Sequence, residues 1–357
     1  MRERERLVGG SDHSSSLGDA PSLRILSLNP HLDDNQIWNA HATSIRSIDP
    51  EFYTRRQVTQ AAILLTQLRN FDVVVFCNNA RLATVLGSLK RLARLNTRVI
   101  LEEMFVDVSP RGSARFGERF RRRVRRSLYS ILANVMDRMV VHTSAEVDLL
   151  AESLRVPRSR FHFIPYFHYN IPDQVAEEGD YVLAIGRHRD FQCFLRAVGD
   201  ALWPAVIVAG ETDREEIGES LPRSVKVRYE VTFAEYRSMI AGARIVVLPL
   251  FGEMWRRSLG QIAAFEAAIM RKPLVVADTF HFRDYFREGE VMRYEAGSSE
   301  SLRAQIDFLM GNPEAAVTMT ARAYDRVTSQ FTHTKYVENL LRACADWSES
   351  GFSGAPL

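Results

Sequence analysis

The chain has 357 residues, of which 46% are apolar and 25% charged, and its formal net charge is +2. This composition is typical of a soluble globular protein, and the length suits two domains better than one hydrophobic core. The three cysteines, Cys77, Cys193 and Cys344, are far apart and odd in number, which argues against a disulfide framework or a metal site and favours a reducing compartment.

The sequence contains no apolar run of the roughly 18 residues that a membrane span requires. Residues 1–20 carry charges where a secretion signal needs an apolar core, so we expect a disordered tail there. A cytoplasmic protein is therefore expected.

Short β-branched runs alternate with helical periodicity along the first half of the chain. The expected strands are Leu23–Leu28, Asp72–Cys77, Arg98–Leu101, Met139–His142 and Phe161–Ile164. Helical periodicity is clearest over Arg56–Arg69 and Leu82–Leu95. This alternation predicts a βα-type domain over residues 21–168. A stretch with two prolines and a cluster of acids then predicts a linker, to which we assign residues 169–180.

A second series of strands follows the linker. Its expected members are Tyr181–Ile185, Ala205–Ala209, Val225–Tyr229, Arg244–Leu248, Pro273–Ala277 and Val291–Tyr294. Runs that are apolar on both faces and joined by helices indicate parallel sheets covered on both sides. We therefore expect an α/β protein of two Rossmann-like, doubly wound domains that face each other across a cleft. The second domain spans 181–330, and a C-terminal helix and tail in 331–357 could pack back on the first domain.

One segment of the first half is strongly basic. Eight arginines and one acid, Glu118, lie between Arg111 and Arg126, and apolar residues recur every three or four positions from Phe116 to Met139. The pattern predicts an amphipathic helix whose basic side suits an anionic membrane surface. A stripe packed on the sheet with solvated arginines is the alternative. Nucleic acid is not expected as a partner, because aromatic interleaving and an RNA-binding signature are absent.

Three stretches of the second half together resemble the family 4 glycosyltransferases of the GT-B fold. They are YVLAIGRHRDFQCFLRAV, VTFAEYRSMIAGARIVVLPL and SLGQIAAFEAAIMRKPLVVAD, with RVPRSRFHFIPY before them and FTHTKYVENLLRA after them. The resemblance covers roughly residues 138–342, whereas the first 137 residues share only the general layout. The resemblance implies transfer of a hexosyl group from a nucleotide-sugar donor, with retention of anomeric configuration and without a metal or other cofactor. A lipid-linked, polysaccharide or other glycan is the implied acceptor.

The third stretch carries most of the implied donor site. By the resemblance, Glu266 accepts from the two ribose hydroxyls of the donor, which suits a carboxylate among apolar neighbours; a surface helix residue is the alternative. Ser258 stands where the family usually has another glutamate, so donor-sugar contact there is of a different kind. Gly260 and Gln261 lie at a helix start, where backbone N–H groups can approach a ligand closely.

Two further turns belong to the implied donor site. Gly186, Arg187 and Arg189 follow the first strand of the second half, where the family binds the diphosphate, and guanidinium groups suit phosphate oxygens. The sequence does not rank the two arginines, and solvated loop residues are the alternative. Val231 lies where the family's backbone reads the nucleotide base. No G-x-G-x-x-G fingerprint follows any strand, which counts against a dinucleotide oxidoreductase.

The acceptor side departs from the family. The histidine that commonly follows the RVIL strand is missing, and Glu102 and Glu103 stand there instead. Glu103 is our candidate to act as a base or to position the acceptor hydroxyl. The family's glycine-rich loop after the first strand is also replaced, by Asn29-Pro30-His31. A non-catalytic GT-B partner or scaffold subunit at a membrane surface is therefore the alternative function.

Overall fold

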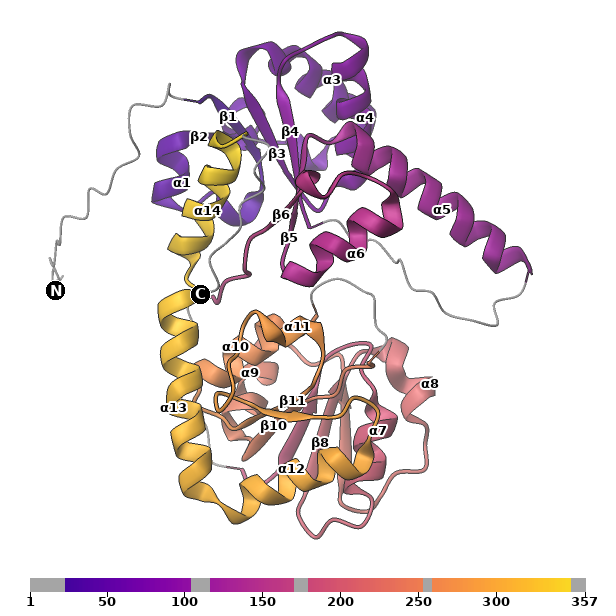
Figure 1. Ribbon diagram of the computed structural model, residues 1–357, viewed down its shortest axis with the longest axis vertical. Helices are drawn as coiled ribbons and strands as arrows, with labels where there is room; N and C mark the ends of the chain where they lie inside the picture. Colours follow the sequence, from indigo (N-terminus) through magenta and orange to yellow (C-terminus); the bar gives the residue numbers. More distant parts are fainter. Residues whose placement is uncertain (1–22, 104–115, 170–178, 253–258, 348–357) are drawn as a thin grey trace, which may run out of the picture.

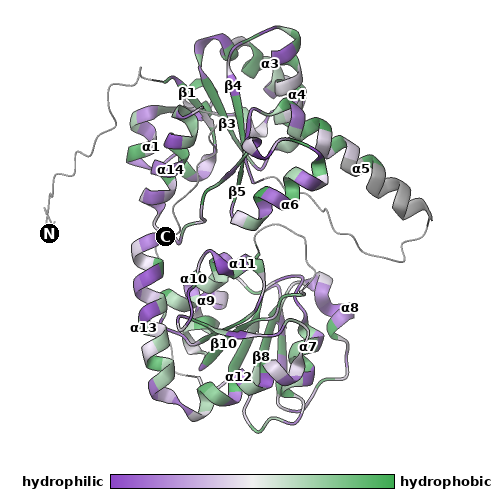
Figure 2. Ribbon diagram, viewed as in Figure 1, coloured by the Kyte–Doolittle hydropathy of each residue, from purple (hydrophilic) through white to green (hydrophobic). Residues whose placement is uncertain are grey.

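The computed structural model describes residues 23–103, 116–169, 179–252 and 259–347. Two domains are stacked along the long axis of the molecule, each built on one sheet with helices on both sides (Figure 1). In each domain the strands of its sheet form the hydrophobic centre (Figure 2). No helix in the described part of the chain is long and apolar enough to cross a membrane.

The N-terminal sheet has six parallel strands in the order β2-β1-β3-β4-β5-β6. Their bounds are β1 Ile25–Leu28, β2 Ala42–Ser44, β3 Val73–Cys77, β4 Arg98–Glu102, β5 Arg138–Val141 and β6 Phe161–Phe163. All five strands expected from the sequence are confirmed. The strand β2 was not expected, because a run of three small or polar residues, Ala-Thr-Ser, carries no apolar signal.

Alternate residues of the central strands feed two separate cores. Val74 and Val99 pack beneath the helices α3, α4, α5 and α6, whereas Val73 and Ile100 pack with Trp38 of α1 and with α14. The helices of this domain are α1 Gln36–His41, α2 Ile45–Ile48, α3 Gln57–Gln67, α4 Ala80–Leu92, α5 Phe116–Val135 and α6 Ser144–Leu154, with 3-10 turns η1 Pro30–Leu32, η2 Phe52–Thr54, η3 Leu68–Asn70 and η4 Arg158–Arg160.

The C-terminal sheet has six parallel strands in the order β12-β11-β10-β7-β8-β9, the Rossmann order read from the other edge. Its strands are β7 Val182–Ile185, β8 Ala205–Ala209, β9 Val225–Tyr229, β10 Ile245–Leu248, β11 Leu274–Ala277 and β12 Met292–Tyr294, as expected from the sequence. Its helices are α7 Phe191–Val198, α8 Arg214–Ile217, α9 Phe233–Gly242, α10 Gln261–Ile269, α11 Phe280–Arg283, α12 Ser299–Gly311 and α13 Pro313–Gln330, with the 3-10 turn η5 Glu211–Asp213. The order of strands reverses between β10 and β7, and such a reversal opens a crevice at the carboxyl ends of the strands.

The chain passes between the domains a second time near its C-terminus. After α13, the helix α14 (His333–Ala345) lies against the N-terminal sheet (Figure 1). The two crossings lie side by side, because the His168 N–H donates to the Phe331 carbonyl at 2.8 Å. Beyond α14, the Trp347 ring lies 4.3 Å from the guanidinium carbon of Arg98 and 4.3 Å from that of Arg138. These contacts fasten the end of the described chain to the first domain.

Candidate active site

The loops at the carboxyl ends of the two sheets meet. The Tyr285 hydroxyl, in the segment after α11, donates to the carbonyl of His142 at the end of β5, and it accepts from the Tyr166 N–H at 2.9 Å. The Asp284 carboxylate accepts from the Ser144 N–H at 2.8 Å and from its hydroxyl at 2.7 Å. Loops at the carboxyl ends of the strands of both sheets thus border the region between the domains.

The turn after β7 buries one arginine. Gly186 has a φ of 127°, and a Cβ there would lie 2.4 Å from Arg189 Nε, so only glycine leaves room for the arginine to fold back. Arg189 is 5% exposed, and its Nη1 has no hydrogen-bond partner. Burial lowers the pKa of this guanidinium to about 10. Nε donates to the Ile185 carbonyl at 3.4 Å and the charge of Asp213 acts on the group, but Nη1 is left to bind an anion, because an unsatisfied buried cation is costly.

The second arginine of the turn has a different environment. Arg187 is exposed and forms an ion pair with Glu230 at 2.6 Å, between Nη2 and Oε2. Glu230 follows β9 with a φ of 47° and also accepts from the Glu211 N–H at 2.8 Å. Arg187 is therefore already neutralised. The two arginines that the sequence did not rank therefore differ in environment, because Arg189 is buried and Arg187 is exposed and paired.

The start of α10 lies next to Arg189. Gly260 has a φ of 91°, and a Cβ there would lie 3.2 Å from Phe282 Cζ and 3.5 Å from Arg189 Nη2. Gln261 is buried, and its amide donates to the His281 carbonyl at 2.9 Å, so this side chain holds the turn of α11. Ser258 lies outside the described residues.

Glu266 is on the buried side of α10, and a cation from α9 reaches it. The residue is 2% exposed, and its Oε1 accepts from Arg237 Nε at 2.9 Å. No hydrogen bond of normal geometry reaches the buried Oε2. Burial raises the pKa of Glu266, while the hydrogen bond and charge of Arg237 oppose that rise. Val231 is half-buried between β9 and α9 and follows Glu230 in the chain.

Sequence reasoning missed Arg237. The available signal was the T-x-x-E capping box of Thr232 and Glu235, which fixes the start of α9 and places Arg237 in its second turn. That signal predicts the helix, but it does not predict that α9 packs against α10.

On the N-terminal side, two consecutive glutamates have different environments. Glu102 is 1% exposed and accepts from Asn29 Nδ2 at 3.1 Å and from the Tyr336 hydroxyl of α14. Burial raises the pKa of Glu102 to about 7, against the lowering effect of these hydrogen bonds. Glu103 has a φ of 56°, an unusual backbone for a residue with a side chain, and its carboxylate is partly exposed.

His142, at the end of β5, is a candidate residue that sequence reasoning did not single out. Its Nδ1 lies 2.9 Å from the Ile164 carbonyl and donates to it, so in the neutral ring Nε2 presents a lone pair. Nε2 is buried without a hydrogen-bond partner, 3.9 Å from Glu103 Oε1. The resembling family commonly has its histidine after the strand that corresponds to β4, whereas here a histidine follows the neighbouring strand β5.

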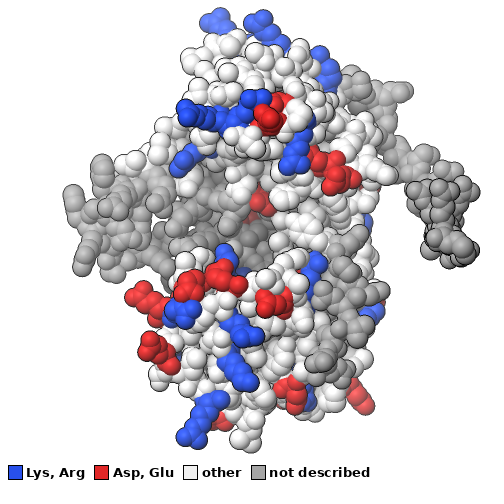
Figure 3. Space-filling view, turned by 180° about the vertical axis from the view of Figure 1, so that it is seen from behind, with Lys and Arg blue, Asp and Glu red and all other residues white. Residues whose placement is uncertain are grey.

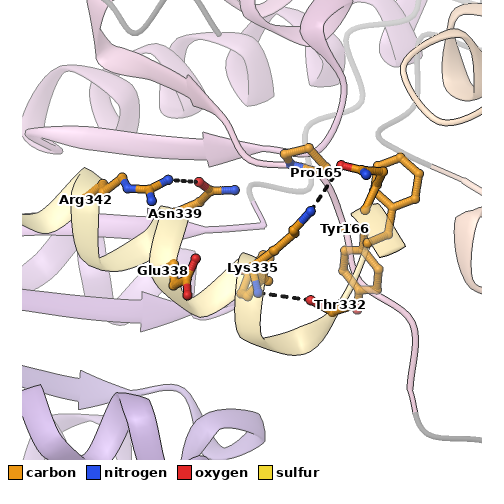
Figure 4. A pocket seen from close by; sticks show the side chains of 10 residues that line it. Pro165, Tyr166, Thr332, Lys335, Glu338, Asn339 and Arg342 are labelled. Atoms are coloured by element: carbon orange, nitrogen blue, oxygen red, sulfur yellow. Dashed lines mark hydrogen bonds between the residues drawn. The ribbon is translucent and has the colours of Figure 1, made fainter. Parts of the chain in front are cut away.

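A pocket of about 210 Å³ lies beside these strand ends, because Tyr336 in its lining donates to Glu102 and the Tyr166 ring lies 4.9 Å from that of His142. It sits between the crossing at Pro165 and Tyr166 and the start of α14, where Lys335 and Arg342 contribute exposed cations (Figure 4). On the face seen from behind, the acidic and basic side chains of the described residues are interspersed (Figure 3). Among the described residues, no three His, Cys, Asp or Glu side chains are grouped as a metal site requires.

Comparison with known proteins bears on the fold and on the class of protein. Residues 187–342 match a family model described as glycosyl transferase-like. No match was found among curated protein sequences. The whole architecture is the GT-B fold, which the chain shares with solved glycosyltransferase structures.

Three of these structures illustrate the likeness. HepE of Anabaena in complex with UDP-glucose is 12% identical, with a TM-score of 0.64 over 90% of this chain and 99% of that one. Sucrose-phosphate synthase from Thermosynechococcus elongatus is 14% identical, with a TM-score of 0.60 over 82% and 78%. TarM of S. aureus, in complex with UDP and an α-GlcNAc-glycerol among its ligands, is 16% identical, with a TM-score of 0.58 over 80% and 58%.

Proposed function

We propose that the protein is a glycosyltransferase that moves a hexosyl group from a UDP-sugar to a glycan or lipid-linked acceptor. The observation that carries this proposal is Arg189, a buried guanidinium whose Nη1 has no hydrogen-bond partner, at the strand-order reversal of the C-terminal sheet. A diphosphate at the end of β7 would give it a counter-charge, and the same charge would stabilise the leaving nucleoside diphosphate. UDP as the nucleotide is supported by the ligands of HepE and TarM.

The other donor contacts follow from the neighbours of Arg189. In this proposal Gly186 and Gly260 let the backbone approach the phosphates, Glu266 accepts from the ribose hydroxyls, and the backbone at Val231 contacts the base. Family 4 membership and retention of configuration are supported by the sequence resemblance.

For the acceptor, the proposal uses the loops of the N-terminal sheet. Glu103 and the lone pair of His142 Nε2 would accept the hydrogen bond of the attacking hydroxyl and hold its oxygen toward the anomeric carbon. Both groups lie where the carboxyl ends of the N-terminal strands approach the C-terminal domain, because the His142 carbonyl itself contacts Tyr285.

We further propose that α5 places the enzyme on an anionic membrane surface. This helix extends away from the body of its domain (Figure 1). Val124, Leu128 and Ile131 are 43%, 59% and 54% exposed at helical spacing, whereas Leu132 and Val135 are buried in the domain core. An apolar stripe that the domain leaves uncovered, on a helix with this many arginines in its sequence, matches the headgroup boundary of an anionic bilayer. Arg111 to Arg115 lie outside the described residues.

Titration calorimetry tests the donor site. The protein should bind UDP more tightly than UMP, because the second phosphate contacts Arg189. Arg189→Met should lower the ratio of UDP affinity to UMP affinity about tenfold or more, since a charge-assisted hydrogen bond contributes about 1.5–3 kcal/mol. Arg187→Met is the matched control and should change little, because Arg187 is paired with Glu230.

A non-catalytic GT-B partner is the second candidate, favoured by Ser258 in place of the family's glutamate. Release of UDP from UDP-glucose over time, with water or added glycan as acceptor, distinguishes the two. Binding without any release supports the partner function. A protein that binds neither UDP nor UDP-glucose contradicts both the donor site and the proposed activity.

A further inference from the structure

The pair between Glu266 and Arg237 is a buried feature that the proposed donor site does not explain. Both side chains are largely enclosed, with exposures of 3% and 11%. Arg237 uses Nε for the contact, and its guanidinium carbon lies 4.2 Å from the centre of the Phe233 ring one turn earlier in α9. The cation is thus held flat between an aromatic face and a carboxylate, which fixes its position.

The elements around α10 offer Glu266 no other strong cation in the described part of the chain. The strands β10 and β11 beneath it consist only of Ile, Val, Leu and Ala. From α13, Tyr324 faces Arg271, which follows the end of α10. From α9, the Tyr236 hydroxyl also lowers the pKa of Glu266, and the charge of Arg189 acts on Tyr236. Among these groups, Arg237 opposes the effect of burial on the pKa of Glu266 most, and Tyr236 follows it.

We propose that Arg237 is a positioning residue that keeps Glu266 ionised and leaves Oε2 to accept from the nucleotide, so that the site selects ribose over sugars without vicinal hydroxyls. This inference rests on the proposed donor site. The hydrogen bond to Oε1 fixes the carboxylate plane and leaves the unbonded Oε2, with the remaining lone pair of Oε1, for two hydroxyl donors. A carboxylate can accept both, whereas a protonated carboxyl group is itself a donor and gives up the charge-assisted bonds.

The sign of the pH effect follows from burial. Burial raises the pKa of Glu266, and Arg237 opposes that rise. Without the cation the pKa rises further, and the neutral form gains population as the pH falls. A variant without the charge at position 237 should therefore lose ribose selectivity most at low pH and regain part of it at high pH.

The test compares UDP with 2′,3′-dideoxy-UDP by calorimetry at about pH 6 and about pH 8.5. Phosphate ionisation and the Arg189 contact are common to both nucleotides and cancel in the affinity ratio. In the wild-type protein the ratio should be high and nearly equal at both values. In Arg237→Met it should fall about tenfold or more at the lower pH and recover toward the higher one. Arg237→Lys, which restores the charge, should restore the ratio at the lower pH.

Three outcomes overturn the inference. The first is an unchanged ratio in Arg237→Met, the second is an equal loss of affinity for both nucleotides at both pH values, and the third is tighter UDP binding, which would mean that Arg237 competes with the ribose. Should Arg237→Met fail to fold, Arg237→Gln keeps a donor without the charge and carries the same comparison. If the wild-type protein binds UDP, the proposed diphosphate contact of Arg189 stands whichever way the ratio behaves, whereas a wild-type ratio near one removes Glu266 and Arg237 from the ribose site. If the wild-type protein does not bind UDP, both proposals fall together.

Discussion

At the scale of single residues, three of the buried polar atoms without partners lie at the candidate site. Arg189 Nη1, Glu266 Oε2 and His142 Nε2 each lack a hydrogen bond in the interior. Leaving such a group unsatisfied costs about 1–3 kcal/mol. The three atoms belong to a guanidinium, a carboxyl group and an imidazole, drawn from both domains. A diphosphate, a sugar diol and a hydroxyl group are the complementary partners, and these are the parts of the proposed substrates.

Replacing Glu266 by Gln tests its assignment to the ribose. The amide keeps the shape of the side chain but removes the charge that strengthens both hydrogen bonds, so UDP binding should weaken by about 1.5–3 kcal/mol in calorimetry. Glu314→Gln, on the exposed first turn of α13, is the control and should leave binding unchanged. Unchanged UDP affinity in a folded Glu266→Gln protein would remove Glu266 from the donor site.

At the scale of elements, α5 provides a prediction that involves no nucleotide. The wild-type protein should sediment with anionic vesicles and less with neutral ones, and salt should release it. Each arginine near such a surface adds about 1 kcal/mol within a Debye length. Changing Arg121, Arg122, Arg125 and Arg126 together to Gln should abolish sedimentation while UDP binding stays intact.

The exposed apolar side chains of α5 provide the matched variant. Leu128→Ser with Ile131→Ser should reduce vesicle binding without lowering the melting temperature, because both side chains are more than half exposed. A lowered melting temperature would mean that the stripe packs within the protein. Sedimentation of the quadruple arginine variant, or wild-type binding that ignores lipid charge, would show that α5 is a solvated packing helix.

The sequence predicted elements better than contacts between them. Strands such as Val73–Cys77 and Ile245–Leu248 were expected, because buried parallel strands are continuous apolar runs. The turn of Arg189 was expected from its place after β7. The Glu266–Arg237 pair was not, since periodicity defines a helix without defining its neighbour. The environment of His142 likewise depends on Ile164 and Glu103, which follow the strands β6 and β4.

At the scale of the whole molecule, α14 is the last helix in the described chain, yet it packs into the core on one face of the N-terminal sheet. Leu340 is fully buried there, so Leu340→Ala should destabilise the protein by about 2–5 kcal/mol. Hydrogen exchange should show the lost protection in β1, β3 and β4. Leu309→Ala, in α12 beneath the C-terminal sheet, is the matched control and should expose that sheet instead. Loss of protection confined to the C-terminal sheet in Leu340→Ala would contradict this assignment.

The position of α14 also sets an order of events during synthesis. The ribosome releases residues 23–169 long before His333–Ala345, so one face of the N-terminal sheet, with Val73, Val75 and Ile100, stays uncovered while the second domain is made. The core around the C-terminal sheet extends no further along the described chain than Phe331, the residue after α13, so this domain can close first. The half of the protein that is translated first therefore completes its folding last, and its apolar sheet face must remain protected for the whole interval.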